Sequence, residues 1–281
     1  SQGFEISRRL MRWRGMSAQV LHPPLGFNDF VPGQGEGDYF MIAGRLHPWK
    51  RFDLLIKAVR FAKRPVRLLI AGEGEFEPEL RRLAQGMDGI EFLGRISDEE
   101  LIRLYSGAIA VPFIPQREDY GYVTLEAFAS GSPVLTCTDS GEPAHIVRNF
   151  ETGLVVPPEP QAIAEALDWF WDNRKEARAM GLRGLELVNE MSWRDTAYAL
   201  ASAATDGLSP SHQDTRRITV LDMQPIDPPT GGGRLRLLGL YHNLGADTRC
   251  QYVGTYDWPG EKYRAHALSP TLSEIDIPLS D

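Results

Sequence analysis

Cysteine is scarce in this chain: only Cys137 and Cys250 occur among its 281 residues. They lie far apart and form neither a CxxC pair nor a metal-ligand spacing, so a disulfide framework is excluded and a reducing compartment is favoured. Long hydrophobic runs are absent too, since none approaches the roughly 18–20 apolar residues of a membrane span. We therefore expect a cytoplasmic protein that touches a membrane at most from its surface.

Positive charge is outweighed by negative charge. The chain has 30 lysines and arginines against 38 acidic residues, which gives a net charge of −8. No basic block offsets this balance, so we expect no nucleic-acid partner. One local cluster, Arg8, Arg9, Arg12 and Arg14, could hold a polyanion or a lipid headgroup, but a solvated helix face is the more frequent explanation of such a pattern.

What the sequence does contain, from about Tyr39 onward, is an alternation of short apolar runs with amphipathic segments. Strands are expected at residues 40–43, 66–71, 90–93, 109–113, 134–137 and 153–156. Helices are expected at residues 52–63, 77–84, 97–105 and 123–130 and around 163–170, and Ser97 with Glu100 is typical of a capping box. This alternation predicts right-handed βαβ units and thus an α/β, Rossmann-like fold with a parallel sheet.

Composition divides the chain into four parts. Residues 1–37 contain one helix (6–16), a strand (19–22) and a glycine-rich linker, and residues 38–205 form the Rossmann-like domain. Residues 206–217 are rich in Ser, Pro and charge and are typical of a second linker. Residues 218–281 hold extended, partly alternating runs, which we interpret as the start of an all-β module and hence a partial β-rich domain. We expect both ends to be cut from something longer.

Two cations follow the first predicted strand of the Rossmann-like domain. Gly44 permits a tight turn there, and Arg45 and Lys50 come directly after it. Arg offers a planar fork and Lys a mobile point charge, so together they could bind one diphosphate and stabilise its departure. Taken alone, solvated surface cations are the more frequent case; the glutamates farther along the chain favour the binding site.

Glu118 and Glu126 are separated by seven residues, in Glu-Asp-Tyr-Gly-Tyr-Val-Thr-Leu-Glu. The first precedes a predicted helix, and the second lies slightly more than one turn inside it. Gly121 between them lets a backbone approach a ligand, and the helix N-terminus offers N–H groups to an anion. The pair could be an acid and a base that hydrolyse a glycoside, a helix-terminal charge beside a surface carboxylate, or two hydroxyl-binding groups. The placement around a helix start favours the last.

The other motifs are less specific indications of function. Gly72-Glu-Gly74 lacks the full GxGxxG spacing of a dinucleotide fold and is better explained as a turn. Gly94, Arg95 and Ile96 end a strand, where their backbone could border a nucleobase. His47 and His145 follow strands, but a solvated loop histidine is more frequent, and no His/Cys/Asp spacing predicts a metal site.

In combination these segments resemble a known family. Gly44-Arg-Leu with Lys50, the pair Glu118 and Glu126, and Thr152-Gly-Leu-Val-Val-Pro-Pro are similar to the C-terminal domain of group 1 glycosyltransferases (family 4, GT-B fold), over roughly residues 20–200. The resemblance implies a retaining, metal-independent transferase that uses a nucleotide-diphosphate sugar as donor and needs no cofactor.

The resemblance also implies residue roles. Glu118 would contact the donor sugar as the catalytic group, and Glu126 would bind the ribose. Arg45 and Lys50, with the backbone of Tyr122 and Val123, would bind the diphosphate. Tyr120 and Gly121 would bind the sugar, and Gly94, Arg95 and Ile96 would border the base.

The chain departs from the family pattern at a few positions. Asp119 and Tyr120 occupy the middle of the first motif, and His145 stands where the family usually carries a glutamate, which leaves the donor preference open. The family's N-terminal domain, which would hold a carbohydrate or lipid-linked acceptor, is represented only by its end. We therefore expect a donor-binding half that is inactive alone. A GT-B-fold sugar-nucleotide epimerase and a non-catalytic carbohydrate-binding or scaffold protein remain alternatives.

Overall fold

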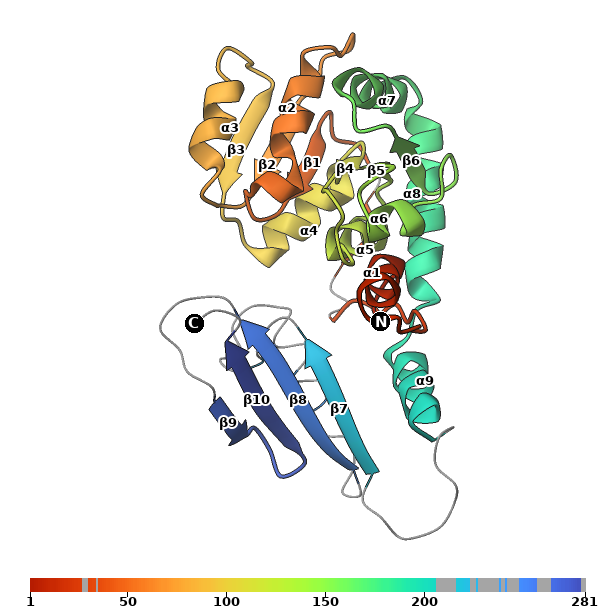
Figure 1. Ribbon diagram of the computed structural model, residues 1–281. Helices are drawn as coiled ribbons and strands as arrows, with labels where there is room; N and C mark the ends of the chain where they lie inside the picture. The colour runs from red at the N-terminus through yellow and green to blue at the C-terminus, as the bar shows by residue number, and fades with distance from the viewer. Residues whose placement is uncertain are drawn as a thin grey trace. The chain divides into compact units, whose positions relative to one another are not determined.

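The computed structural model divides the chain into two compact units, Ser1–Ala199 and Leu200–Asp281 (Figure 1). It describes residues 1–26, 30–33, 35–205, 216–222, 226, 238, 241, 248–256 and 264–278.

The first unit is built on parallel strands, as predicted. β1 (Phe40–Ala43), β2 (Leu68–Ala71) and β3 (Ile90–Gly94) form one ladder, and β4 (Val111–Pro112), β5 (Val134–Cys137) and β6 (Gly153–Val156) form another.

Backbone hydrogen bonds connect these two ladders. The N–H of Ile109 donates to the carbonyl of Tyr39 (2.9 Å) and that of Met41 to Ala110 (3.4 Å). The combined order is therefore β3-β2-β1-β4-β5-β6, which is the Rossmann order, with its switch point between β1 and β4.

Helices cover the sheet, and several of them do so with one apolar face. Along α2 (Phe52–Val59), for example, the buried residues are Phe52, Leu55, Ile56 and Ala58, which recur at helical spacing. The side-chain hydroxyl of Ser97 accepts the N–H of Glu100 at the start of α4, which confirms Ser97 as the N-cap, while the Glu100 carboxylate accepts hydrogen bonds from Arg103. The remaining elements that connect or follow the strands are η1 (Pro48–Lys50), α3 (Glu77–Leu83), α4 (Asp98–Gly107), α5 (Tyr122–Ala129), α6 (Glu142–Ile146), α7 (Pro160–Asp172) and α8 (Arg174–Asn189) (Figure 1).

Two glycines allow the loops after β1 and β2 to touch through their backbones. A Cβ on Gly72 would lie 2.0 Å from the carbonyl oxygen of Gly44, and one on Gly74 would lie 2.2 Å from that of Leu46. The N–H of Leu46 donates to the carbonyl of Glu73 (3.0 Å) across the same contact. The glycine-rich turn therefore serves close packing between loops, in agreement with its interpretation as a turn.

The N-terminal segment differs in part from its prediction. Helix α1 spans Phe4–Arg14 and ends at Gly15, whose φ of 64° is the left-handed conformation of a typical C-cap. The strand predicted at residues 19–22 is not formed. Among the described residues, that segment makes backbone hydrogen bonds to Ser1, through the N–H of Leu21 and the carbonyl of Gln19, and pairs with no strand.

The second unit contains β7 (Arg216–Asp222), β8 (Thr248–Tyr256), β9 (Arg264–Ala267) and β10 (Leu272–Pro278), in the order β7-β8-β10-β9. The predicted β-rich character is confirmed. Among the described strands, β7 pairs parallel to β8 and β8 parallel to β10, whereas β9 pairs antiparallel to β10. The sheet is therefore mixed, and its parallel neighbours need crossover connections.

Helix α9 (Trp193–Thr205) follows α8. The predicted linker at residues 206–217 and the extended run predicted at 234–240 fall almost wholly outside the described residues. Among the residues that are described, no helix is both long and apolar enough to cross a membrane.

Candidate functional site

The predicted diphosphate- and sugar-binding residues follow β1 and β4, two neighbouring strands at the switch point, and the residues expected to border the base follow β3. The loops after β1, β4 and β5 meet at the carboxyl edge of the sheet, on either side of the switch point, which is where open α/β sheets bind ligands. The three loops are tied together by hydrogen bonds, so their side chains have defined positions relative to each other.

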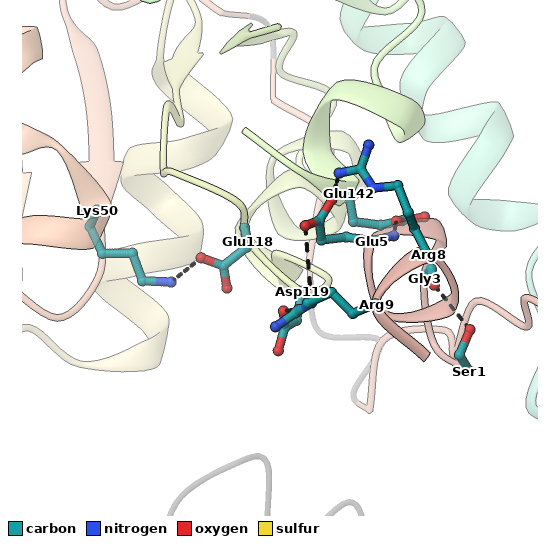
Figure 2. Close-up of polar contacts among 9 residues, drawn as sticks. All are labelled: Ser1, Gly3, Glu5, Arg8, Arg9, Lys50, Glu118, Asp119 and Glu142. Atoms are coloured by element: carbon teal, nitrogen blue, oxygen red, sulfur yellow. Dashed lines mark hydrogen bonds and ion pairs between the residues drawn. The ribbon is translucent and has the colours of Figure 1, made fainter. Parts of the chain in front are cut away.

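Lys50 and Glu118 form the central contact of this edge. The Lys50 Nζ lies 2.5 Å from the Glu118 Oε2, and Figure 2 shows the two side chains pointing toward one another from separate loops. The ammonium also lies 5.5 Å from the centroid of the Phe113 ring. The side chains are 28% and 22% exposed, so both charges remain accessible to a ligand.

The backbone around Glu118 is fixed by the loop after β5. Its N–H donates to the carbonyl of Ser140, and its carbonyl accepts the N–H of Glu142, both at 2.9 Å. Gly141 between them has φ 78°, and a Cβ there would lie only 2.4 Å from the Glu118 carbonyl oxygen. A glycine is therefore required at this position for the two loops to pair.

Arg51 links the three loops and was missed by sequence reasoning. Its Nη2 donates to the carbonyl of Pro115 (2.9 Å) and to the Asp139 Oδ1 (2.7 Å), and the N–H of Gln116 donates to the carbonyl of Trp49 (2.8 Å). These bonds hold Lys50, the preceding residue, beside Glu118. The only sequence signal was a second cation next to Lys50, and spacing alone did not distinguish the two.

The N-terminus of α5 lies next to Glu118. Gly121 is its N-cap with φ 79°, and a Cβ there would approach the Phe113 ring to 2.7 Å and Pro143 to 2.8 Å. Tyr122 and Val123 are the first helical residues, whose N–H groups find no acceptor within the helix itself. The backbone that was predicted to bind an anion therefore begins a few residues after Glu118, the catalytic candidate.

Glu126 lies in the second turn of α5, half-buried and in a different environment from Glu118. Its neighbour is Tyr105 of α4, which is completely buried. Burial raises the pKa of the Tyr105 phenol well above its usual value, and the negative charge of Glu126 raises that pKa further.

Arg45 is not part of the Lys50 contact. Its side chain is 72% exposed, and its Nη2 lies 3.4 Å from the Oε2 of Glu75 in the loop after β2. His47 approaches the other oxygen of Glu75 at 3.3 Å. A backbone hydrogen bond within Glu75, with the charges of Arg45 and His47, lowers the pKa of its carboxyl. The structure thus places one of the two predicted cations against Glu118.

The residues expected to border the base end β3. Gly94 adopts φ 65°, and its carbonyl accepts the N–H of Gly72 (2.7 Å), which ties the ends of β2 and β3 together. Arg95 is exposed and Ile96 half-buried. All three lie on the same carboxyl edge as Lys50, two strands away from β1.

A second polar group, centred on Glu142, was not predicted. Glu142 is completely buried, and its Oε1 lies 2.6 Å from the His22 Nε2. Its Oε2 accepts the N–H of Glu5 at the start of α1 (3.2 Å). Burial opposes ionisation of Glu142, but the hydrogen bonds from His22 and from the Glu5 N–H outweigh it and lower its pKa. No sequence signal marks this contact, because its partners are more than a hundred residues apart.

Helix α1 also contacts the residues that follow Glu118. Arg9 forms an ion pair with Asp119 (Figure 2). The Tyr120 hydroxyl donates to the carbonyl of Pro23, in the segment that follows α1. Arg8 pairs with Glu5 within the helix. Arg9, from the arginine cluster that was interpreted as a solvated face, therefore contacts the segment that follows Glu118.

Comparison with known proteins identifies the family. The model of the group 1 glycosyl transferases matches residues 28–186, which is more than half of the chain. The chain therefore belongs to the group 1 glycosyltransferases, and the matched range contains every predicted site residue.

Curated relatives agree with this assignment. The D-rhamnosyltransferase WbpZ of Pseudomonas aeruginosa is 31% identical over 146 residues, which cover 51% of this chain and 38% of the relative. The D-inositol 3-phosphate glycosyltransferase of Mycolicibacterium smegmatis is 30% identical over 214 residues, which cover 68% of this chain and 48% of the relative. The chain thus spans about half the length of these relatives or less.

Solved structures show the same fold. Alr3699/HepE of Anabaena, in a crystal structure with UDP and glucose, superposes with a TM-score of 0.64 at 17% identity, over 73% of this chain and 62% of that one. At this identity the likeness concerns the fold alone. The fold is thus an α/β, GT-B-like one, as the sequence predicted.

Proposed function

We propose that this chain supplies the donor-binding half of a retaining, metal-independent family 4 glycosyltransferase, which moves a sugar from a nucleotide-diphosphate donor to a carbohydrate or lipid-linked acceptor. The observation that carries the proposal is the Lys50–Glu118 pair, held at the switch point of the sheet beside the N-terminus of α5. A cation, a carboxylate and a helix N-terminus at one place fit a ligand that has both an anion and hydroxyl groups.

The leaving diphosphate needs positive charge as its bond to the sugar breaks. Lys50 provides one full charge, and the N–H groups of Tyr122 and Val123 add the partial charge of the helix end. Arg45 lies on the same loop as Lys50 and is exposed, so its guanidinium can turn from Glu75 to the diphosphate. Charge from these groups would take the place of a metal ion.

Donor binding would exchange the partners of the central pair. In the structure Lys50 and Glu118 neutralise each other. With a donor in place, Lys50 would bind phosphate oxygens and Glu118 would accept hydrogen bonds from hydroxyls of the sugar. Tyr120 and Gly121 would border that sugar, Glu126 would bind the ribose diol, and Gly94, Arg95 and Ile96 would border the base.

Support for the donor class comes from the family and from relatives whose names specify sugar transfer. The fold neighbour from Anabaena was crystallised with UDP and glucose. Retention at the transferred carbon is the outcome that the Glu118 and Glu126 pattern implies through its resemblance to family 4.

The proposal is tested by screening UDP-, GDP- and ADP-sugars for a rise in the melting temperature of the 281-residue chain. A ligand that binds only the folded state raises that temperature. Lys50→Ala should weaken binding of the best donor about tenfold or more, because a charge-assisted contact to phosphate is lost. Lys57→Ala is the matched control, since Lys57 pairs with Asp53 on α2. No shift with any nucleotide sugar, or equal affinity of both variants, would overturn the proposal.

A further inference from the structure

One face of the sheet in the second unit carries polar side chains. Side chains alternate between the two faces of a strand, and the pairing places Glu274 opposite both Tyr252 and His266. Asp276, two residues farther along β10, is opposite Arg264. Figure 1 shows β9 and β10 as neighbours. An imidazole and two carboxylates therefore share one face.

The two carboxylates are buried. Glu274 is fully inaccessible and Asp276 is 1% exposed, whereas the His266 side chain is 27% exposed. Burying ionised carboxylates is costly unless a positive charge or hydrogen bonds compensate for the loss of water. The burial of this pair thus requires compensation from its surroundings.

Part of that compensation comes from protein donors among the described residues. The N–H of Ile226 donates to the Glu274 Oε1, and the Arg264 Nε donates to the Asp276 Oδ2 at 2.8 Å. These donors fix the orientation of both groups. Outer partners of this kind are typical of carboxylates that ligate a metal through their other oxygen.

One oxygen of each carboxylate lies near a ring nitrogen of His266. The Glu274 Oε2 lies 3.5 Å from the His266 Nε2, which is too long for a good hydrogen bond. The Asp276 Oδ1 is buried and has no hydrogen-bond partner among the described residues. One ligand atom from each of the three residues lies within 4.8 Å of the other two.

We propose that His266, Glu274 and Asp276 bind a divalent transition-metal cation. Two ligands at about 2.1 Å in tetrahedral arrangement are about 3.4 Å apart, close to the separation of the histidine nitrogen and the Glu274 oxygen. One imidazole with two carboxylates suits Zn²⁺ or Mn²⁺. The exposed side of His266 provides a path of entry, and the ion would fasten β9 to β10. The site is independent of the donor site in the first unit.

The competing explanation is internal neutralisation, with a protonated His266 facing Glu274 and Arg264 facing Asp276. The two explanations differ in a direct measurement. The 281-residue chain is stripped with a chelator, and Mn²⁺ and Zn²⁺ are titrated by calorimetry. We expect saturable binding of about one ion per chain in the micromolar range or tighter, as ligand sets of this kind provide.

Three substitutions test whether the bound ion is held by His266, Glu274 and Asp276. His266→Gln and Asp276→Asn should each weaken it tenfold or more, as loss of a ligand or of its orientation does in metal sites. Ser273→Ala is the matched control, because Ser273 precedes Glu274 on β10, points to the opposite face and donates its hydroxyl to the carbonyl of Cys250 (3.4 Å); it should leave the affinity within about twofold. His266→Gln decides the outcome if Asp276→Asn does not fold, since His266 is partly exposed. Absence of saturable binding, or unchanged affinity in His266→Gln, overturns the proposal.

Discussion

The ammonium of Lys50 lies 2.5 Å from a carboxylate oxygen of Glu118, and this contact joins the loops that follow β1 and β4. The two residues are 68 positions apart in sequence and meet because parallel strands end at the same edge of a sheet. In the proposed complex with a donor, each of the two side chains would exchange the other for a group of the ligand.

Glu118→Gln should affect the two parts of a donor in opposite ways. Removing the carboxylate charge leaves Lys50 without its counter-charge, so the nucleoside diphosphate alone should bind as well as before or more tightly. The complete nucleotide sugar should lose the additional affinity that its sugar provides. Calorimetry with the best nucleotide sugar and its diphosphate measures both. Glu100→Gln, at an exposed ion pair on α4, is the control and should change neither. Parallel losses for both ligands would contradict the proposed exchange of partners.

The stability cost of the same substitution should be small. The pair is about a quarter exposed, and an ion pair so accessible to solvent contributes at most about 1 kcal/mol to the free energy of unfolding. A much larger loss in urea unfolding would mean that Glu118 has a structural role.

Gly141→Ala should destabilise the fold more than Gly86→Ala. The two glycines have similar positive φ values, 78° and 76°, so both substitutions strain the backbone, and alanine in the left-handed helical conformation costs about 1–2 kcal/mol. Gly141 also has ψ −131°, outside that conformation and in a region essentially restricted to glycine, so its strain is at least as large. A Cβ on Gly141 would also lie 2.4 Å from the Glu118 carbonyl oxygen, while one on Gly86 meets nothing within 4 Å. Overpacking at Gly141 adds about 1–3 kcal/mol. Urea unfolding of the two variants measures the difference, and equal losses would show that the Glu118 loop can move.

Acid should weaken the attachment of α1. The folded-state pKa of Glu142 is lowered below its ordinary value of 4.5, so its contribution to stability is complete above that value. It is lost as the pH falls through the lowered pKa, because the folded state must then accept a proton that the unfolded state already holds. Glu142→Gln should therefore flatten the dependence of the unfolding free energy on pH below about 5. Glu186→Gln, at an exposed position of α8, is the control and should keep the dependence of the parent chain.

Both cysteines should be unreactive in the folded chain. Burial raises the pKa of the Cys137 thiol to about 12 and that of Cys250 to about 11. The thiolate is the nucleophile, so its fraction at pH 8 is negligible. A thiol reagent at pH 8 should label neither cysteine in buffer and both in denaturant. Rapid labelling of Cys137 in buffer would show that the end of β5 opens.

Local sequence pattern predicted the framework of the first unit. The strands are continuous apolar runs because both faces of a parallel sheet are buried, and the helices between them repeat their apolar residues at helical spacing. The turn at Gly72 and Gly74 and the cap at Ser97 were recognisable because their chemistry is local. These features need no knowledge of distant residues.

Features that depend on distant partners were not predictable in the same way. Nothing near Glu142 in sequence indicates that His22 and the N-terminus of α1 will enclose its carboxylate. Arg45 was expected beside Lys50, but the loop after β2 supplies Glu75 as its partner. The parallel pairing of β7 with β8 was missed because an isolated extended run looks the same in parallel and antiparallel sheets.

By itself, the sequence determined the α/β alternation, the family to which the chain belongs and the two motifs around Lys50 and Glu118. It could do so because backbone propensity, apolar periodicity and glycine turns are properties of neighbouring residues. Only the tertiary structure decided which charges meet. It selected Lys50 for Glu118, Glu75 for Arg45 and His22 for Glu142, because strand order and loop packing bring together groups whose separation along the chain carries no signal.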